Sequence, residues 1–279
     1  MSVPSPADAG AALRHATTRT RFALRFRHIE VVRVDRLSPH LIRVAFAGGD
    51  LGDFQSAGFD DHVKLFFPAP GESRPVLPAI GPDGGPATGT GALIARDYTP
   101  RRFSAARGEL EIEFAVHEAG PATAWALQAA PGQIIGLGGP RGSMVPADDF
   151  DWYLLAGDDA ALPAIARRLE SLPAGARTFV FAETGGPEDE LPLAAPQGTT
   201  IRWLHRGSTE PGLSTVLDAA LAAFVPPPGD GHVWIAAESG VARRLRTLML
   251  THHNHPKAWL KAAAYWRRGA AGVHDKIED

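Results

Sequence analysis

The sequence contains no cysteine, and this absence excludes several kinds of chemistry. Without a thiol the chain cannot form a disulfide, use a thiolate nucleophile, or bind zinc or an iron–sulfur cluster through cysteine. The absence is also compatible with a reducing cytosol. Lysine is rare, and none of the lysines, at positions 64, 257, 261 and 276, follows a glycine. A phosphate-binding P-loop is therefore excluded as well.

The chain also lacks a strong charge and a long apolar run. Its 28 basic and 31 acidic residues leave a formal net charge of −3, which argues against nucleic acid as the main partner. No segment approaches the roughly 20 apolar residues that span a bilayer. Residues 1–20 have no apolar region of the kind found in secretory signals, so we expect a flexible tail there. These observations predict a cytoplasmic protein without a membrane anchor.

The composition that remains is that of a globular protein, with 44% apolar and 21% charged residues, and 279 residues suffice for two domains. In the first half, segments of strand type follow one another without helices between them. Residues 109–117 alternate apolar residues with three glutamates, as a half-buried antiparallel strand does, whereas the Pro/Gly-rich residues 68–91 are expected to form a surface loop. We predict an antiparallel β domain over residues 21–148, with further strands at 28–34, 41–46 and 62–67.

The second half has a different pattern, in which expected strands alternate with expected helices. This alternation predicts a parallel sheet with right-handed crossovers over residues 149–279. The domain boundary is placed near Asp148. The strands are expected at residues 152–157, 178–183, 200–205 and 232–237, and the helices at 158–172, 213–224 and 241–252.

The stretch that begins at Arg96 combines a cation, an aromatic ring and a hydroxyl. In an extended segment Arg96 and Tyr98 share one face, while Thr99 points to the other. This set suits a flavin, since the cation can pair with a phosphate, the ring can lie against the flavin ring, and the hydroxyl can approach the reactive nitrogen. Taken alone, the same residues are equally compatible with a basic edge strand.

A second stretch predicts an anion site. A strand is expected to end at His117, and Gly120, followed by a proline, begins a short helix. The N–H groups and the positive dipole end at that start can hold the pyrophosphate of a dinucleotide, and Thr123 adds a hydroxyl. The alternative is an ordinary strand–helix junction with Trp125 in the core.

Small or polar residues end four expected strands of the second half. Because the carboxyl ends of parallel strands meet at one edge of a sheet, this edge is where a pyridine nucleotide can bind. Glu183 is placed to hold a ribose hydroxyl, which bears on NADH versus NADPH, although an acid at a strand end is commonly just solvated. The candidates are Gly157 with Asp158, Glu183, His205 and Glu238.

The C-terminal segment is basic and aromatic. Lys257, Lys261, Arg267 and Arg268 are interspersed with aromatic residues. Two interpretations remain open, a solvated amphipathic helix or a wall that attracts an anionic ligand. The histidine-rich residues 252–255 have no spacing that closes a metal site, so no metal is predicted.

Taken together, these motifs resemble the siderophore-interacting protein family, the ferric-siderophore reductase branch of the ferredoxin-reductase-like flavoproteins. The resemblance covers about residues 25–269. The motifs that carry it are Arg96-x-Tyr98-Thr99, His117-x-x-Gly120-Pro121-Ala122-x-x-Trp125-Ala126, Gly139-Pro140-Arg141-Gly142, Ala161-Leu162-Pro163-Ala164-Ile165 and Tyr265-Trp266-Arg267-Arg268-Gly269.

The resemblance implies a six-stranded type of antiparallel β-barrel that binds FAD, followed by an α/β domain that binds NADH or NADPH. It implies that Arg96, Tyr98 and Thr99 contact the flavin, with Thr99 nearest N5. The rest of the dinucleotide would be held by the second motif, through His117, Gly120, Ala122, Thr123 and Trp125. Plant-type reductases carry a Cys-Gly pair near the nicotinamide, where this chain has Ala237-Glu238-Ser239-Gly240.

The activity that the resemblance implies is one-electron reduction of Fe(III) in a ferric siderophore, with NAD(P)H as the electron donor. A basic pocket beside the flavin would bind the siderophore. We expect it to be lined by one cluster of Lys257, Lys261, Arg267 and Arg268, with Arg101 and Arg102 as further candidates. No protein partner is predicted. The alternatives are a general flavin reductase or oxygenase-type reductase, and a flavin-containing siderophore-binding protein that does not turn over NAD(P)H.

Overall fold

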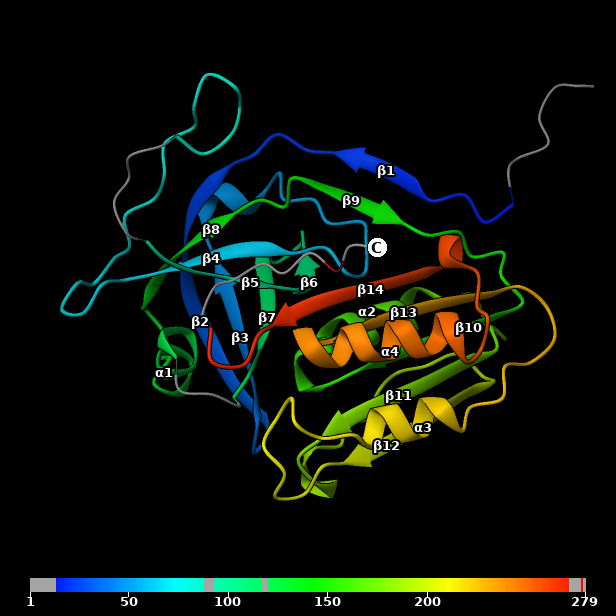
Figure 1. The fold of residues 1–279 in the computed structure, drawn as a ribbon. Coiled ribbons are helices and arrows are strands. Elements are labelled where there is room, and N and C mark those ends of the chain that lie inside the picture. Colours follow the sequence, from blue (N-terminus) through cyan, green and yellow to red (C-terminus); the bar gives the residue numbers. More distant parts are fainter. Residues whose placement is uncertain (1–13, 88–92, 117–119, 271–276, 278–279) are drawn as a thin grey trace, which may run out of the picture.

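In the computed structural model, which describes residues 14–87, 93–116, 120–270 and 277, the first half of the chain forms a curled antiparallel sheet (Figure 1). The strand order is β5-β4-β8-β2-β3-β7-β6. Helix α1 (Pro121–Leu127) packs against this sheet. The strands are β2 (Phe26–Ser38), β3 (Leu41–Ala47), β4 (Val63–Phe67), β5 (Ile94–Tyr98), β6 (Pro100–Ser104), β7 (Glu109–Ala115) and β8 (Ile134–Gly138).

This sheet has seven strands where a six-stranded type was expected. The chain divides at Thr99, so the stretch that begins at Arg96 supplies two strands. β5 pairs with β4, whereas β6 pairs with β7 at the opposite edge of the sheet. Thr99 therefore lies where the chain crosses between the two edges of the curled sheet.

The predicted alternation of β7 is confirmed on its apolar face, where Leu110, Ile112 and Phe114 are fully buried in the core of the sheet. The other face differs from the expectation of a solvated surface, because Glu111 and Glu113 are only 6% and 3% exposed. They are buried together with arginines that pair with them. Arg33 donates to Glu111 (2.8 Å), and Arg43 and Arg101 lie against Glu113.

A small two-stranded sheet joins β1 (Thr18–Arg21) to β9 (Gly142–Val145). The expectation of a flexible tail up to residue 20 is therefore wrong for residues 18–20. All four side chains of β1 are exposed, so the segment has no burial pattern from which its pairing could be predicted. The N-terminal arm, residues 14–21, is thus an ordered part of the fold.

The second half forms a sheet in which all five strands are parallel, in the order β12-β11-β10-β13-β14 (Figure 1). α2 packs on one face, and α3 and α4 pack on the other. The strands are β10 (Trp152–Gly157), β11 (Thr178–Thr184), β12 (Thr199–His205), β13 (Gly231–Glu238) and β14 (Leu260–Trp266). The helices are α2 (Leu162–Ser171), α3 (Val216–Ala222) and α4 (Ser239–Thr251), with short 3₁₀ turns η1 (Gly49–Leu51), η2 (Asp159–Ala161), η3 (Pro187–Asp189) and η4 (Lys257–Trp259).

The predicted parallel α/β arrangement is confirmed, and its connectivity creates a crevice. The chain adds β11 and β12 on one side of β10, then returns to add β13 and β14 on the other. Ligands of such sheets bind outside the carboxyl ends of the strands where the order reverses. Here that point lies between β10 and β13. The boundary proposed near Asp148 falls in the segment that joins β9 to β10.

The C-terminal basic segment is a strand, so the interpretation as an amphipathic helix is wrong. Its side chains alternate with a period of two, which is the period of a strand and not of a helix. Leu260 and Ala262 pack with α3 and α4, whereas Ala263 and Tyr265 pack with α2 on the opposite face. Pairing with β13 makes this segment the edge of the parallel sheet.

The two sheets are joined by ion pairs. Arg101 of β6 is 7% exposed, and its guanidinium makes a two-pronged contact with the carboxylate of Glu170 in α2 (2.6 and 3.0 Å). Arg102 contacts the same carboxylate (3.2 Å). Both arginines had been expected as candidates for an anion pocket. Their pairing instead fastens α2 to the antiparallel sheet. No helix in the described ranges is long and apolar enough to cross a membrane.

Candidate functional site

The expected flavin motif lies at the end of β5. The guanidinium of Arg96 donates to the carbonyl oxygen of Ala95 (2.7 Å), and within the described ranges no carboxylate pairs with it. The ring of Tyr98 packs against Phe114, with the ring centroids 4.5 Å apart. Burial raises the pKa of Tyr98, so the phenol stays neutral at physiological pH. The motif therefore offers a cation without an acidic partner next to a neutral aromatic ring.

Thr99 is 7% exposed and links the motif to the second sheet. Its side chain lies close to the phenol of Tyr265, near the end of β14, and burial raises the pKa of that tyrosine as well. The Tyr265 ring lies edge-on against Trp234 of β13, with centroids 6.0 Å apart. The carboxyl end of the parallel sheet thus meets the motif at Thr99, which is the arrangement that transfer between two cofactors requires. In Figure 1, β14 points toward the antiparallel sheet.

The start of α1 carries backbone groups rather than side chains. Gly120 is the N-cap, no side chain caps the helix, and a β-carbon at Gly120 would meet nothing within 4 Å. Ala122 and Trp125 are buried in the core, where Trp125 packs against Phe46 and Phe114. The alternative in which the side chain of Trp125 lies in the core is therefore correct. Thr123 is partly exposed, and His117 lies outside the described residues.

Asp158 ties together three strand ends at the crevice of the parallel sheet. Its Oδ2 accepts hydrogen bonds from the backbone N–H of Glu238 (2.9 Å) and from the indole N–H of Trp266 (2.8 Å). Its Oδ1 accepts from the N–H of Ala160 (3.1 Å). The carboxylate is 6% exposed and links β10, β13 and β14. The sequence placed Asp158 at this edge, but nothing in it indicated the contact with Trp266.

Two other predicted residues have structural roles at the same edge. The carboxylate of Glu238 accepts from the N–H groups of Gly240 (2.5 Å) and Val241 (3.2 Å), so it caps the start of α4. At Gly157 a β-carbon would lie 2.3 Å from the carbonyl oxygen of Ala236 and 2.4 Å from the Ala161 β-carbon. Glycine is thus needed there for the packing of β10 against β13 and η2.

Glu183 is buried, with 2% of its surface exposed. The alternative that this acid is merely a solvated residue at a strand end is therefore wrong. Burial, with the nearby charge of Asp158, raises the pKa of Glu183 to about 7. That Glu183 holds a ribose hydroxyl, which bears on NADH versus NADPH, stays a prediction. At the end of the neighbouring strand, β12, His205 pairs with Glu190 (2.9 Å), and Arg206 pairs with Asp159 (2.6 Å).

The burial of Glu183 predicts a pH dependence of stability. Because the native state keeps this carboxyl protonated up to a pKa of about 7, against 4.5 for an exposed glutamate, the native state binds more protons than the unfolded state in that window. The free energy of unfolding should therefore fall between about pH 4.5 and 7, by up to about 3 kcal/mol. Glu183→Gln should reduce this slope in urea unfolding measured across pH. Glu190→Gln, at a partly exposed carboxyl, should retain it, and parallel curves for Glu183→Gln and the unchanged protein would contradict the assignment.

The four cations expected to form one cluster do not lie together. Lys257 and Lys261 are at the start of β14, whereas Arg267 and Arg268 follow its end. At about 3.3 Å per residue, Lys261 and Arg267 are roughly 20 Å apart. Lys261 pairs with Asp60, and Arg268 with Glu210 (each 2.5 Å). The prediction of a single cluster is wrong because the segment is extended, and only the arginines follow the end of the strand that carries Tyr265.

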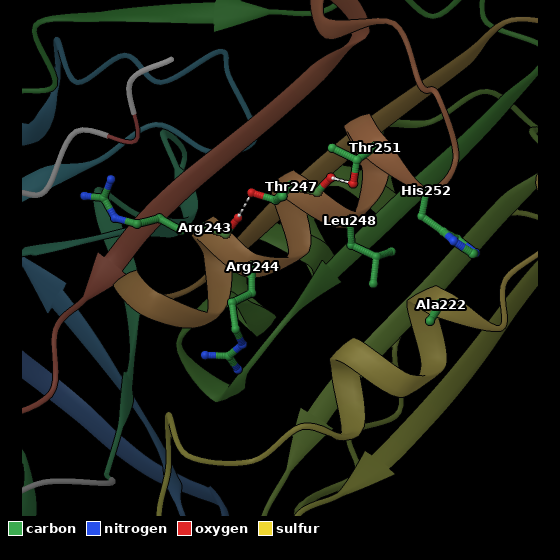
Figure 2. A pocket seen from close by; sticks show the side chains of 7 residues that line it. All are labelled: Ala222, Arg243, Arg244, Thr247, Leu248, Thr251 and His252. Carbon is green, nitrogen blue, oxygen red and sulfur yellow. Dashed lines mark hydrogen bonds between the residues drawn. The ribbon is translucent and has the colours of Figure 1, made fainter.

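A cavity of about 510 Å³ lies between α3 and α4, away from these strand ends (Figure 2). The hydroxyls of Thr247 and Thr251 donate to carbonyl oxygens of their own helix (3.0 and 2.8 Å), as Figure 2 shows. Arg244 pairs with Asp218 (2.9 Å). These two hydroxyls and this guanidinium already have partners within the protein, so this cavity is not the candidate site.

Comparison with known proteins assigns the chain to a family. Residues 30–144 match the family model of the siderophore-interacting FAD-binding domain, and residues 150–269 match that of the siderophore-interacting protein. The "NADPH-dependent ferric-chelate reductase" of Escherichia coli is 36% identical over 89% of this chain and 95% of its own length. The chain belongs to the siderophore-interacting protein family. Within this family, the "ferric vibriobactin reductase ViuB" of Vibrio cholerae is 32% identical, over 87% of this chain and 90% of its own.

The fold of the family is also found among solved structures. A siderophore utilization protein from T. fusca superposes with a TM-score of 0.87 and 38% identity, covering 92% of this chain and 98% of its own. The two-sheet arrangement described above is therefore that of a siderophore-interacting protein.

Proposed function

We propose that this siderophore-interacting protein is an FAD-containing, NAD(P)H-dependent reductase of ferric siderophores that works in the cytoplasm. The observation that carries the proposal is the 36% identity over nearly the whole length of a relative named "NADPH-dependent ferric-chelate reductase". The ferric vibriobactin reductase points to the same class of substrate.

The residues of the antiparallel sheet fit FAD. Arg96 has no carboxylate partner in the described ranges, so its guanidinium is available to a phosphate. The uncapped start of α1, with open space at Gly120, offers N–H groups to a pyrophosphate. Tyr98 and Thr99 lie at the end of β5 and offer a ring and a hydroxyl to the flavin. This assignment keeps Arg96, Tyr98, Thr99, Gly120 and Thr123 in the roles that the sequence suggested.

The nicotinamide nucleotide is assigned to the carboxyl ends of β10 and β13. The order of the parallel strands reverses there, and the proximity of Tyr265 to Thr99 brings this edge to the flavin motif. Asp158 and Glu238 hold this edge together. Asp158 accepts a hydrogen bond from Trp266 of β14, and Glu238 caps the start of α4.

When bound, FAD supplies the conversion of a two-electron hydride donor into a one-electron reductant. The protein's part is to bind and orient. Arg96 neutralises phosphate charge, and Tyr98 remains a neutral ring because of its burial. Arg267 and Arg268 follow the end of β14 near Thr99, where they attract the anionic oxygens of a ferric siderophore. Lys257 and Lys261 are left out of this role.

The proposal is tested by stepwise anaerobic reduction of the FAD-reconstituted protein. NADH or NADPH should bleach the flavin absorbance, and ferric siderophore should restore it while an Fe(II)-specific chelator traps the released iron. Rates with each nucleotide will decide the donor. Faster turnover with free flavin than with ferric siderophore would indicate a general reductase instead. Siderophore binding without NAD(P)H oxidation would indicate a carrier.

A further inference from the structure

A set of hydrogen bonds joins the two sheets next to the carboxyl end of β11. We call it the β11 clamp, and it consists of Ser38 and His40 at the turn between β2 and β3, and of Asp189 in η3. Oδ1 of Asp189 accepts from the Ser38 hydroxyl (2.8 Å) and from the backbone N–H of His40 (3.1 Å). Oδ2 lies 2.8 Å from Nδ1 of the His40 ring. Three donors of the antiparallel sheet therefore converge on one carboxylate of the second half.

The carboxylate of Asp189 is buried and charged. Its side chain is 2% exposed. Burial raises the pKa of Asp189, but the hydrogen bonds from His40 and Ser38 outweigh this effect and hold the pKa below its usual value. An ionised carboxylate can only accept, so Nδ1 of His40 carries the proton of their hydrogen bond. Hydrogen bonds to a charged acceptor are short and strong, so the β11 clamp is a firm link between the sheets.

The β11 clamp lies against the end of β11 itself. At Gly185, directly after β11, an added β-carbon would lie 2.7 Å from Oδ2 of Asp189 and 3.4 Å from Nδ1 of His40. The same loop is tied to the end of β12, because the backbone N–H of Gly207 donates to the carbonyl oxygen of Gly185 (3.0 Å). The β11 clamp therefore reaches the edge of the parallel sheet to which the nicotinamide nucleotide is assigned.

His40 is also bonded to the segment that leads to the FAD site. Its carbonyl oxygen accepts from the backbone N–H of Val116 (2.9 Å), which directly follows β7. After β7 the chain runs to the start of α1, which is assigned to the pyrophosphate of FAD. One residue thus contacts both the end of β7 and the loop after β11, and a shift of His40 would change the position of one relative to the other.

Other polar contacts between the two halves involve different elements, α2 and β13. They are Arg101 with Glu170 of α2 (2.6 Å), Ser56 with Arg167 of α2 (3.1 Å), and Asp60 with Trp234 of β13 (3.0 Å). Contacts at α2 and β13 alone would allow the sheets to pivot about these elements, as domains do about a hinge. The β11 clamp adds a hold on another strand and fixes the angle between the sheets.

We propose that His40 and Asp189 are positioning residues for hydride transfer, because they fix the nucleotide edge relative to the flavin-binding sheet. The inference rests on the proposed function, in which one hydride passes from NAD(P)H to the flavin, so that the nucleotide is oxidised and the flavin reduced. A displacement of about 1 Å can slow such a step about a hundredfold. The two residues act through the placement of the loop after β11.

The test measures the limiting rate of flavin reduction in the FAD-reconstituted chain, by anaerobic stopped-flow absorbance at saturating NADPH and at saturating NADH. His40→Ala should lower this rate about tenfold or more. The dissociation constant of FAD and the Tm should change little, because the Ser38 hydroxyl and the backbone N–H of residue 40 still donate to Asp189. His40→Gln should restore most of the rate, since its side-chain amide can donate to the carboxylate.

Arg36→Gln is the matched control, because it removes a hydrogen bond within the same turn. Arg36 donates to the carbonyl oxygen of Pro39 (2.8 Å), and this contact does not cross to the parallel sheet. The Arg36→Gln protein should reduce its flavin at the rate of the unchanged protein.

A distance measurement tests the β11 clamp without any turnover. The chain has no cysteine, so the double variant Glu30→Cys/Ala219→Cys can carry one spin label on β2 and one on α3, both at exposed positions. The distribution of distances between the labels should broaden when His40→Ala is added, and should stay narrow with Arg36→Gln.

Three outcomes would overturn the positioning role and leave the proposed function intact. They are an unchanged rate in His40→Ala, an equal loss of rate in Arg36→Gln, and a distance distribution that His40→Ala does not alter. A flavin that neither NADPH nor NADH reduces in the unchanged protein would instead contradict the proposed function, and the inference with it.

Discussion

Replacing Arg96 by glutamine is expected to weaken FAD binding by about ten- to a hundredfold. A hydrogen bond between a guanidinium and a phosphate contributes about 1.5–3 kcal/mol, and 1.4 kcal/mol corresponds to a factor of ten in affinity. Arg96 donates to the carbonyl oxygen of Ala95 and has no carboxylate partner in the described ranges, so its removal leaves no buried acid unpaired. The loss should therefore appear in cofactor affinity and not in stability.

The measurement is a titration of the apoprotein with FAD, followed by flavin fluorescence, together with a thermal unfolding curve of each apoprotein. Arg107→Gln is the matched control, because Arg107 lies in the turn between β6 and β7 and pairs with Glu109 (3.0 Å) at the surface. It should bind FAD as the unchanged protein does. An Arg96→Gln protein with unaltered FAD affinity would remove Arg96 from the flavin site.

Gly157→Ala is expected to destabilise the protein by about 3 kcal/mol or more, which is at the upper end of overpacking effects. The added β-carbon would lie 2.3 Å from the backbone oxygen of Ala236 and 2.4 Å from the Ala161 β-carbon, which belong to β13 and η2. Neither neighbour is the far end of a flexible side chain. β10 must therefore move away from β13, and the crevice at their carboxyl ends changes with it.

Gly120→Ala provides the control for this prediction, since both glycines were selected from the sequence for the same kind of role. The φ angle of Gly120 is −162°, in the extended region, and a β-carbon there meets nothing within 4 Å. Its cost should be about 0.5 kcal/mol or less. Thermal unfolding should separate the two variants by about 6 °C or more. Similar Tm values would show that the packing of β10 against β13 tolerates a side chain.

These two experiments probe different features of the same site. The Arg96→Gln variant tests whether the end of β5 holds the phosphates of the flavin. The Gly157→Ala variant tests whether the crevice depends on the close contact of β10 and β13. Tyr265 lies between them, with its phenol close to Thr99. The chemistry of a ferric-siderophore reductase needs both cofactors at one place, and this contact is what brings the two sheets there.

Much of the fold follows from local patterns in the sequence. The alternation of residues 109–115 identified β7, and the short apolar run of residues 152–157 identified β10 as a strand buried on both faces. A change from consecutive strands to alternating strands and helices marked the parallel sheet. Because these signals depend only on residues close together in the chain, the elements can be recognised from the sequence alone.

The sequence by itself also determined which chemistry is available: no thiol, a cation and ring at Arg96 and Tyr98, and polar strand ends such as Asp158. Only the tertiary structure decided how these groups meet. In the folded chain Glu183 is buried, Arg101 pairs with Glu170, and Lys261 and Arg267 lie at opposite ends of a strand. The physical reason is that burial and pairing depend on neighbours far away in the chain, which the spacing of residues along the sequence does not encode.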